Sequence, residues 1–166
     1  MFRFAYLDKQ QKDIWLPKMF DLLYDNMRLI APGDLPYEEE KQQWLSNVSP
    51  ALKKAPRQVL LAFWKEELVG FIQFYTRQEL LMVEEMQIQK EYQGTSLFYA
   101  LCRFLGRNLP ADIHYLEAFA HSQNLHSLKL MQKMGMNPIE DRHQQDFIHL
   151  QGQLQSTIFA PIIHIS

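Results

Sequence analysis

The chain has 166 residues, of which 47% are hydrophobic, 13% aromatic and 22% charged. This composition excludes a disordered chain and a collagen-like repeat, and the length predicts one domain spanning residues 1–166. Seventeen basic and nineteen acidic residues give a net charge of −2, so neither nucleic acid nor an anionic membrane is expected as a partner.

The chain has a single cysteine, Cys102. This count excludes a disulfide framework and a multi-cysteine zinc site, and it favours a reducing compartment such as the cytoplasm. The six histidines show no i, i+4 pair on one helix face, so no metal site is expected. Polar residues follow Met1 within eight positions, and the longest apolar runs, such as Val59 to Trp64, are strand-sized, so neither a signal peptide nor a membrane span is expected.

The first part of the chain is predicted to be mainly helical. Its expected elements are a strand at Met1 to Leu7, an amphipathic helix at Asp13 to Ile30, a second helix that begins at Pro36, and a break at Pro50 to Pro56. We expect Pro17 in the first turn of its helix, where no backbone N–H is needed. The acidic residues at 38–40 occupy the first turn of the second helix, where its dipole favours them.

Three strand-like stretches follow, at Gln58 to Trp64, Leu68 to Tyr75 and Leu80 to Ile88. The links between them are short enough for hairpins, so these strands should be antiparallel. A helix at Thr95 to Leu109, a strand at Ile113 to Ala120, a helix at Gln123 to Met134, and strands at Phe147 to Leu150 and Ile158 to Ile165 complete the chain. The order β-α-α-β-β-β-α-β-α-β-β predicts an α/β fold with a mixed central sheet and helices on both faces.

The stretch from Val83 to Phe98 carries the strongest functional signal. A strand ends there in a short turn with one glycine, Gly94, and continues into a helix. This arrangement points backbone N–H groups and the positive end of the helix dipole at an anion, and a phosphate-bearing ligand is the natural candidate.

Two sequence blocks resemble the GNAT superfamily of N-acetyltransferases. The run EEMQIQKEYQGTSLF from Glu84 to Phe98 is similar to the family's central motif, in which an acidic strand leads to Arg/Gln-x-x-Gly-x-Gly/Ala. The run NLHSLKLMQKMGM from Asn124 to Met136 is similar to a second block, and the two have the expected order and separation. Together they extend the resemblance over Val59 to Asp141.

The resemblance implies an enzyme that moves an acetyl group from acetyl-CoA to a primary amine of a small molecule or peptide. It implies acetyl-CoA between two parallel strands that splay apart. The main chain of Met86, Gln87 and Ile88 would pair with the pantetheine arm, and amides from Gln93, Gly94, Thr95, Ser96, Leu97 and Phe98 would hold the pyrophosphate. Asn124, Ser127 and Lys133 would contact the cofactor from the second block.

Three residues depart from the family pattern. Ser96 and Phe98 stand where the family carries small residues, and Met131 stands where many members carry a tyrosine that protonates the leaving thiolate. Methionine has no proton to donate. These departures favour an alternative, in which the chain keeps the fold and binds CoA as a regulatory module with little or no turnover.

Glu84 and Glu85 are the candidate general bases, because an amine must lose a proton before it attacks the thioester. Adjacent residues on a regular strand point to opposite faces. We expect Glu84 to share a face with Met82, Met86 and Ile88, where the apolar flank would raise its pKa, and we rank it above Glu85. In the competing interpretation one glutamate is solvated and the other forms an ion pair.

The sequence does not define the acceptor. The run Glu38 to Glu40 is either a solvated helix start or a surface that attracts a cationic substrate, since the segment between the first two helices shapes the acceptor site in the family the chain resembles. The apolar tail around Ile158 to Ile163 is either a closing strand or a homodimer contact.

Overall fold

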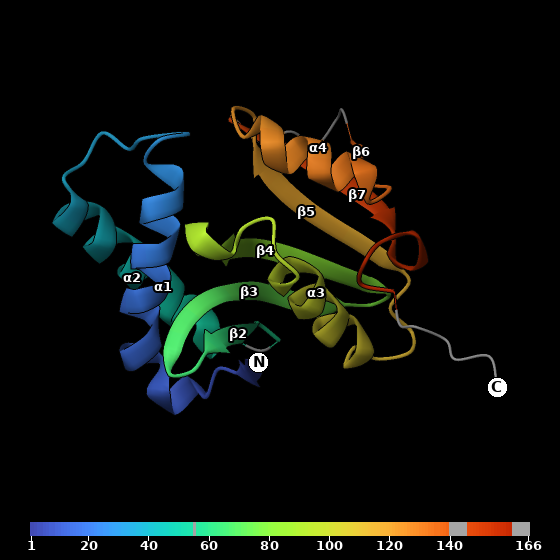
Figure 1. Ribbon diagram of the computed structural model, residues 1–166, viewed down its shortest axis with the longest axis horizontal. Helices are drawn as coiled ribbons and strands as arrows, with labels where there is room; N and C mark the ends of the chain where they lie inside the picture. Colours follow the sequence, from blue (N-terminus) through green and yellow to red (C-terminus); the bar gives the residue numbers. More distant parts are fainter. Residues whose placement is uncertain (55, 140–145, 161–166) are drawn as a thin grey trace.

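The computed structural model describes residues 1–54, 56–139 and 146–160. In this part of the chain, seven strands form one sheet in the order β1-β2-β3-β4-β5-β7-β6 (Figure 1). The strands are β1 (Phe2–Tyr6), β2 (Gln58–Trp64), β3 (Glu67–Arg77), β4 (Leu80–Ile88), β5 (Tyr115–His121), β6 (Asn137–Pro138) and β7 (Phe147–Gln153). The α-helices are α1 (Lys12–Met27), α2 (Tyr37–Lys53), α3 (Leu97–Arg107) and α4 (Leu125–Lys133).

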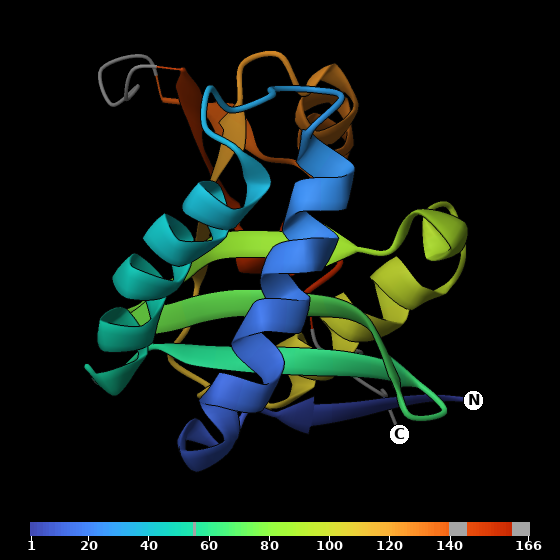
Figure 2. The ribbon, with the colours of Figure 1, turned by 90° about the vertical axis from the view of Figure 1, so that its left-hand side faces the viewer.

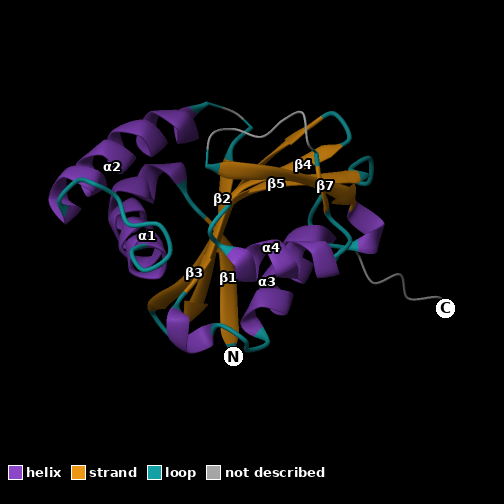
Figure 3. Cartoon of the chain, turned by 90° about the horizontal axis from the view of Figure 1, so that it is seen from above, coloured by secondary structure: helices purple, strands orange, loops and turns teal. Residues whose placement is uncertain are grey.

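The sheet is mixed, because β4 and β5 are parallel whereas the other neighbouring pairs are antiparallel. Helices α1 and α2 cover one face and helices α3 and α4 cover the other (Figure 3). Figure 2 shows α1 and α2 crossing in front of the sheet, joined by a loop at the β4 side. The predicted α/β fold, with a mixed sheet between helices, is confirmed.

Each face of the sheet carries its own apolar core. The α3 side is the larger and includes Ile72, Val83 and Ile88 of the strands with Leu97 and Leu101 of α3. The α1 side is built from α1, α2 and the opposite residues of β2 and β3: Leu16, Met19, Leu22, Leu52, Val59, Leu61, Phe63, Leu68 and Phe71. Alternate residues of one strand thus enter different cores, as the two-residue period of a strand requires.

The two predicted hairpins are confirmed. Strand β2 pairs with β3, and β3 with β4, both antiparallel. Each connection turns through a non-glycine residue in the left-handed region, Lys65 at φ 55° and Gln78 at φ 53°. The turns are therefore tight enough to hold neighbouring strands in register.

Both prolines lie further inside their helices than expected. Pro17 is beyond the first turn of α1, and Pro50 lies within α2, which continues to Lys53. The prediction of a break from Pro50 onwards is therefore wrong. Pro17 leaves the carbonyl of Asp13 without its helical donor, and Asp13 is exposed, so water can replace the missing bond.

The C-terminal strand prediction is wrong where the structure describes it. Residues Ile158 to Ala160 form a turn, because β7 ends in a short 3₁₀ helix at Leu154–Ser156. The rest of the predicted strand lies outside the described residues, as does half of the apolar tail on which a homodimer contact was based. The structure instead adds a two-residue strand, β6, before β7; this strand was not predicted, and the total number of strands matches the prediction only because of it.

The turn after β7 packs against α3. Phe159 is 1% exposed and belongs to the α3-side core. A Cβ atom at Gly106 would lie 1.7 Å from the Phe159 carbonyl oxygen, so glycine is needed for this close approach. No helix among the described residues is long and apolar enough to cross a membrane.

Candidate active site

The parallel pair β4 and β5 separates halfway along β4. Their ladder runs from Leu80 and Tyr115 to Val83 and Ala118 and ends there, although both strands continue. Figure 1 shows the two strands diverging beyond this point. The Gln89 N–H donates to Val69 of β3 at 2.9 Å, so by alternation the main-chain groups of Met86 and Ile88 point to the edge that β5 has left.

The segment between β4 and α3 presents main-chain donors without partners. Among the described residues, no acceptor meets the N–H groups of Gly94, Ser96, Phe98 and Tyr99. Gly94 has a φ of 75°, and nothing lies within 4 Å of the position that a Cβ would take. Free N–H groups, the start of an eleven-residue helix and open space together fit the diphosphate of a coenzyme.

The residues that depart from the family motif leave these donors free. Phe98 is half-buried and packs against the α3-side core, and no acceptor among the described residues meets its N–H. Ser96 precedes the helix and its side chain makes no capping hydrogen bond. Thr95 instead shapes the turn: its hydroxyl donates to the Tyr92 carbonyl at 2.6 Å and accepts from the Leu97 N–H at 3.3 Å.

A β-bulge in β4 changes the directions of the two glutamates. Gln73 of β3 pairs with Glu85, and the next residue, Phe74, pairs with Val83, so Glu84 is an extra residue on β4. A bulge turns two consecutive side chains to about the same side. The Gln73 side chain accordingly donates to Glu84 at 3.0 Å, although Gln73 pairs in register with Glu85.

The prediction that the two glutamates point to opposite faces is therefore wrong. Both carboxylates lie on the α1 side of the sheet. Met86 and Ile88, which were expected beside Glu84, pack instead against the α3-side core.

Glu84 is held in an ion pair. The Arg57 guanidinium donates from Nε to both carboxylate oxygens at 2.9 Å and from Nη2 to Oε1 at 2.7 Å. The contact with Glu84 raises the pKa of Arg57 above its already high ordinary value. The guanidinium occupies both carboxylate oxygens, so the interpretation as an ion pair describes Glu84 better than that of a base.

Glu85 has an unusually high pKa for a carboxyl group. Burial raises its pKa to about 7, although hydrogen bonds from the Gln87 side chain and the Met86 N–H offset part of the rise. The Gln87 amide donates to Glu85 Oε1 at 2.7 Å and fixes the carboxylate. Glu85 keeps some accessible surface, and a pKa near neutrality lets it both accept and release a proton.

Asn26 of α1 joins the helix to β4 and to the segment before α3. Its amide donates to the Gln87 side-chain oxygen at 2.9 Å and to the Ile88 carbonyl at 2.8 Å. Gln93 donates to the same Ile88 carbonyl at 2.9 Å and to the Asn26 oxygen at 3.3 Å. The Gln93 side chain thus fastens the segment that carries the free N–H groups.

The residues predicted on α4 lie at different ends of that helix. The Asn124 side chain accepts from the Ser127 N–H at 3.1 Å and caps the N-terminus. Lys133 is exposed in the last turn, at the end away from Asn124. Met131 is half-buried against the α3-side core. The capping bond gives Asn124 and Ser127 a structural role that is independent of any cofactor.

Sequence reasoning did not identify Asn26, Arg57 and Gln73. Their partners in β4 are 61, 27 and 11 residues away, so no local motif marks them. The one available signal was the pair of adjacent acids in the long β4 stretch, because buried carboxylates require nearby hydrogen-bond donors.

Other reactive side chains lie apart from this site. Burial raises the pKa of the Cys102 thiol far above its usual range, which makes it inert. Glu117 and His149 form a buried pair on β5 and β7, 2.9 Å apart, with Gln151 donating to Glu117 at 2.8 Å. Within residues 1–54, 56–139 and 146–160, no three His, Cys, Asp or Glu side chains are grouped as a metal site.

The comparisons with known proteins agree with this geometry. The family model described as an acetyltransferase (GNAT) domain matches residues 36–152. The chain therefore belongs to the GNAT acetyltransferase family and is an acyltransferase. A search of curated protein sequences found no match.

Solved structures with the same fold have low sequence identity to the chain. The PaiA N-acetyltransferase from Thermoplasma acidophilum, in complex with coenzyme A, has a TM-score of 0.70 at 13% identity, covering 92% of this chain and 99% of that one. An acetyltransferase from Thermus thermophilus has a TM-score of 0.70 at 19% identity, with coverages of 93% and 97%. The ribosomal-protein-S18-alanine N-acetyltransferase from Escherichia coli has a TM-score of 0.62 at 15% identity, with coverages of 92% and 94%.

Proposed function

We propose that the protein transfers the acetyl group of acetyl-CoA to a primary amine, with Glu85 as the general base. The observation that carries this proposal is the set of unpartnered N–H groups at the start of α3, next to the open space at Gly94. The N–H groups of Gly94, Ser96, Phe98 and Tyr99 would bind the diphosphate, because those of the intervening predicted residues Gln93, Thr95 and Leu97 are already hydrogen-bonded within the turn. The Met86 carbonyl and the Ile88 N–H, at the open edge of β4, would bind the pantetheine arm.

The reaction needs little covalent chemistry from the protein. The amine arrives as an ammonium and gives one proton to the Glu85 carboxylate. Its lone pair then forms the C–N bond to the thioester carbon as the C–S bond breaks, and the nitrogen loses its second proton to solvent. The products are an amide and CoA, whose thiolate takes up a proton. Most of the catalysis would come from holding the amine and the thioester in position.

Met131 cannot take part in the last step, the protonation of the CoA thiolate. Its thioether has no proton, and it packs in the α3-side core. We propose that the CoA thiolate, a good leaving group, is protonated by water or by Glu85 after it has accepted the proton of the amine. A catalytically silent CoA-binding module would carry the same donors but would show no turnover.

Calorimetric titration with CoA tests the cofactor site. Gly94→Trp should abolish binding, because its side chain would occupy the open space beside the free N–H groups. Gly94→Ala is the matched control, since it carries the same positive-φ strain with one methyl group. If Gly94→Trp binds CoA as tightly as Gly94→Ala does, the diphosphate site lies elsewhere.

A thiol-release assay with acetyl-CoA and a panel of small amines and peptides tests turnover. Release above the hydrolysis blank with any amine would support the proposal. Release that never exceeds the blank, in a protein that binds CoA, would favour the silent module. The free, buried Cys102 is compatible with the cytoplasm, which we propose as the location.

A further inference from the structure

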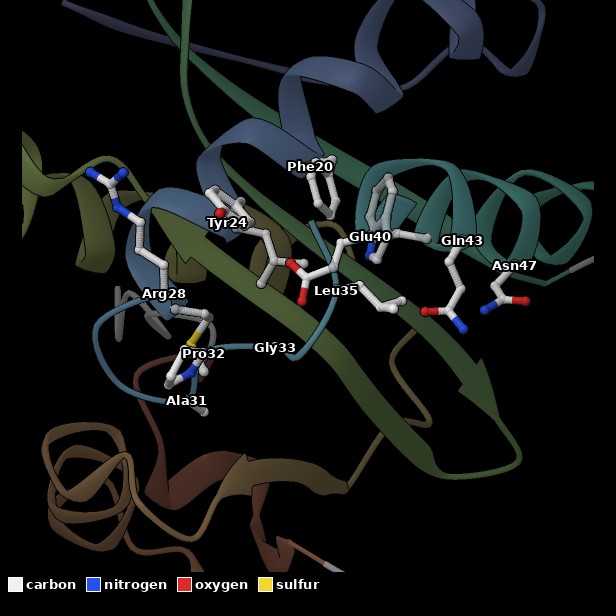
Figure 4. Close-up of a pocket in the computed structure, with 13 residues that line it drawn as sticks. Phe20, Tyr24, Arg28, Ala31, Pro32, Gly33, Leu35, Glu40, Gln43 and Asn47 are labelled. Carbon is white, nitrogen blue, oxygen red and sulfur yellow. The ribbon is translucent and has the colours of Figure 1, made fainter. Parts of the chain in front are cut away.

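A pocket of about 360 Å³ lies between α1, the α1–α2 loop and α2. Its volume is in the range of sites that bind small organic molecules. Met27 lines it on α1, and the preceding residue, Asn26, is hydrogen-bonded to Gln87 and Ile88 of β4. Figure 4 shows β4 crossing behind the lining side chains, and β4 carries Glu85 on this face of the sheet.

The wall of the pocket is mainly apolar and aromatic. The rings come from Phe20, Tyr24 and Trp44, and the Phe20 ring lies 5.8 Å from that of Tyr24 and 5.7 Å from that of Trp44. The aliphatic part comes from Leu23, Met27 and Leu35. The side-chain amides of Gln43 and Asn47 also line the pocket, and the aromatic and aliphatic groups beside them suit a flat, apolar body.

One carboxylate points into this apolar space. Figure 4 shows the Glu40 oxygens pointing from α2 among the lining side chains, whereas the guanidinium of Arg28 points away from them. Among the described residues, the Glu40 carboxylate has no hydrogen-bond or ion-pair partner. It is half-buried, so its negative charge lies at the pocket wall without a cation to balance it.

The surrounding segment adds further negative charge around the pocket. Residues 20–47 contain the acids Asp21, Asp25, Asp34, Glu38, Glu39 and Glu40 and the bases Arg28 and Lys41. Lys41 is itself paired with Asp21 at 2.9 Å. The pocket thus combines a negative field with aromatic rings, which together favour an organic cation.

Glu40 does not suit the nitrogen that reacts. A carboxylate that binds an ammonium stabilises the protonated form, and only the neutral amine can attack a thioester. Glu85 accepts the proton of the reacting nitrogen, so the cation that Glu40 binds must be a different group on the same molecule.

We propose that the acceptor is a primary amine whose ring-sized apolar body carries a second positive charge, with the body in this pocket and the second charge at Glu40. This inference rests on the proposed amine acetylation. In this inference the pocket selects its substrate by a positive charge that is remote from the reacting amine.

Three para-substituted benzylamines test the selection, because they share the reacting aminomethyl group and the ring. They are 1,4-bis(aminomethyl)benzene, 4-methylbenzylamine and 4-(aminomethyl)benzoate, which carry a positive, a neutral and a negative group at the remote position. We expect the diamine to bind about tenfold more tightly than the neutral amine in calorimetric titration, and to have the highest kcat/KM. The benzoate should bind most weakly.

Glu40→Gln should remove the preference for the diamine and leave the binding of 4-methylbenzylamine within about twofold. Glu39→Gln is the matched control: it removes the same charge from the next residue of α2, which is exposed and does not line the pocket. Gly33→Ala gives a second variant, since a Cβ there would lie 1.4 Å from Glu40 Oε1 and would displace the carboxylate without removing its charge.

Equal binding of the three amines would overturn this inference even if acetyl transfer occurs. So would an equal loss of diamine binding in Glu40→Gln and Glu39→Gln. Binding of the diamine that depends on Glu40, together with no thiol release, would support the charge selection and overturn the proposed acetylation instead. The binding and turnover measurements therefore separate the two claims.

Discussion

At the residue scale, Glu85 controls the pH dependence of the proposed reaction. Its pKa is raised to about 7, mainly by burial, so the unprotonated base becomes available only near and above neutrality. We expect kcat/KM to rise with pH up to about 7 and then to level off. Glu85→Gln should lower it by about 10²- to 10⁴-fold, the usual contribution of a general base.

Initial rates from pH 5.5 to 9 measure this profile, with the exposed Glu66→Gln as a charge-matched control. A Glu85→Gln enzyme that kept the wild-type profile would show that another group accepts the proton.

The same residue should make folding stability depend on pH. Below about pH 4.5 Glu85 is neutral in both the folded and the unfolded state. As the pH rises towards 7, the unfolded state ionises first, so the free energy of unfolding falls, by up to about 3 kcal/mol for a shift of this size. Glu85→Gln has no ionisable group at this position, so its free energy of unfolding does not fall for this reason.

The variant should therefore gain stability relative to the wild type between pH 5 and pH 8, as measured by urea unfolding at both values. A stability difference that stayed constant over this range would mean that the Glu85 pKa is not raised.

At the scale of elements, Asn26 of α1 determines which way the Gln87 amide faces. The Asn26 donor occupies the Gln87 oxygen, so the Gln87 nitrogen points to Glu85. Asn26→Asp replaces that donor with an acceptor, which should turn the Gln87 amide around and remove its hydrogen bond to Glu85. The Glu85 pKa, and with it the midpoint of the pH–rate profile, should then rise by about one unit.

Rate measurements over the same pH range check this shift, with Asn137→Asp on the exposed β6 as the control for an added charge. An unchanged midpoint in Asn26→Asp would show that α1 does not influence the base through Gln87.

At the scale of the whole molecule, the turn after β7 and helix α3 depend on one another. Gly106→Ala would improve helix propensity by about 1 kcal/mol. It would also place a methyl group 1.7 Å from the Phe159 carbonyl oxygen, which belongs to the backbone and cannot move easily. We expect the clash to dominate and to lower the free energy of unfolding by about 2–3 kcal/mol.

Urea denaturation checks this prediction, and the neighbouring exposed Arg107→Ala should stay within about 0.5 kcal/mol of the wild type. Unchanged or increased stability of Gly106→Ala would mean that the turn at Phe159 does not pack closely against α3.

Much of this architecture was predictable because it rests on local patterns. Helical spacing, short hairpin links and the two family motifs specified the elements and the course of the sheet. The tail was predicted wrongly because an apolar run also suits a turn that buries Phe159 against a glycine. The choice between Glu84 and Glu85 failed for another reason: strict alternation has no place for an extra residue, and Arg57, which neutralises Glu84, is distant in the sequence.

The bulge also has a consequence for how such a strand can evolve. Val83 and Glu85 already face opposite sides of the sheet, as direct neighbours on a regular strand would. A chain lacking position 84 could therefore close the ladder without turning any other side chain over. It would lose the anchor for Arg57 but keep the base, so insertion or deletion at this position is a single mutational event that changes the surroundings of the reaction and preserves the fold.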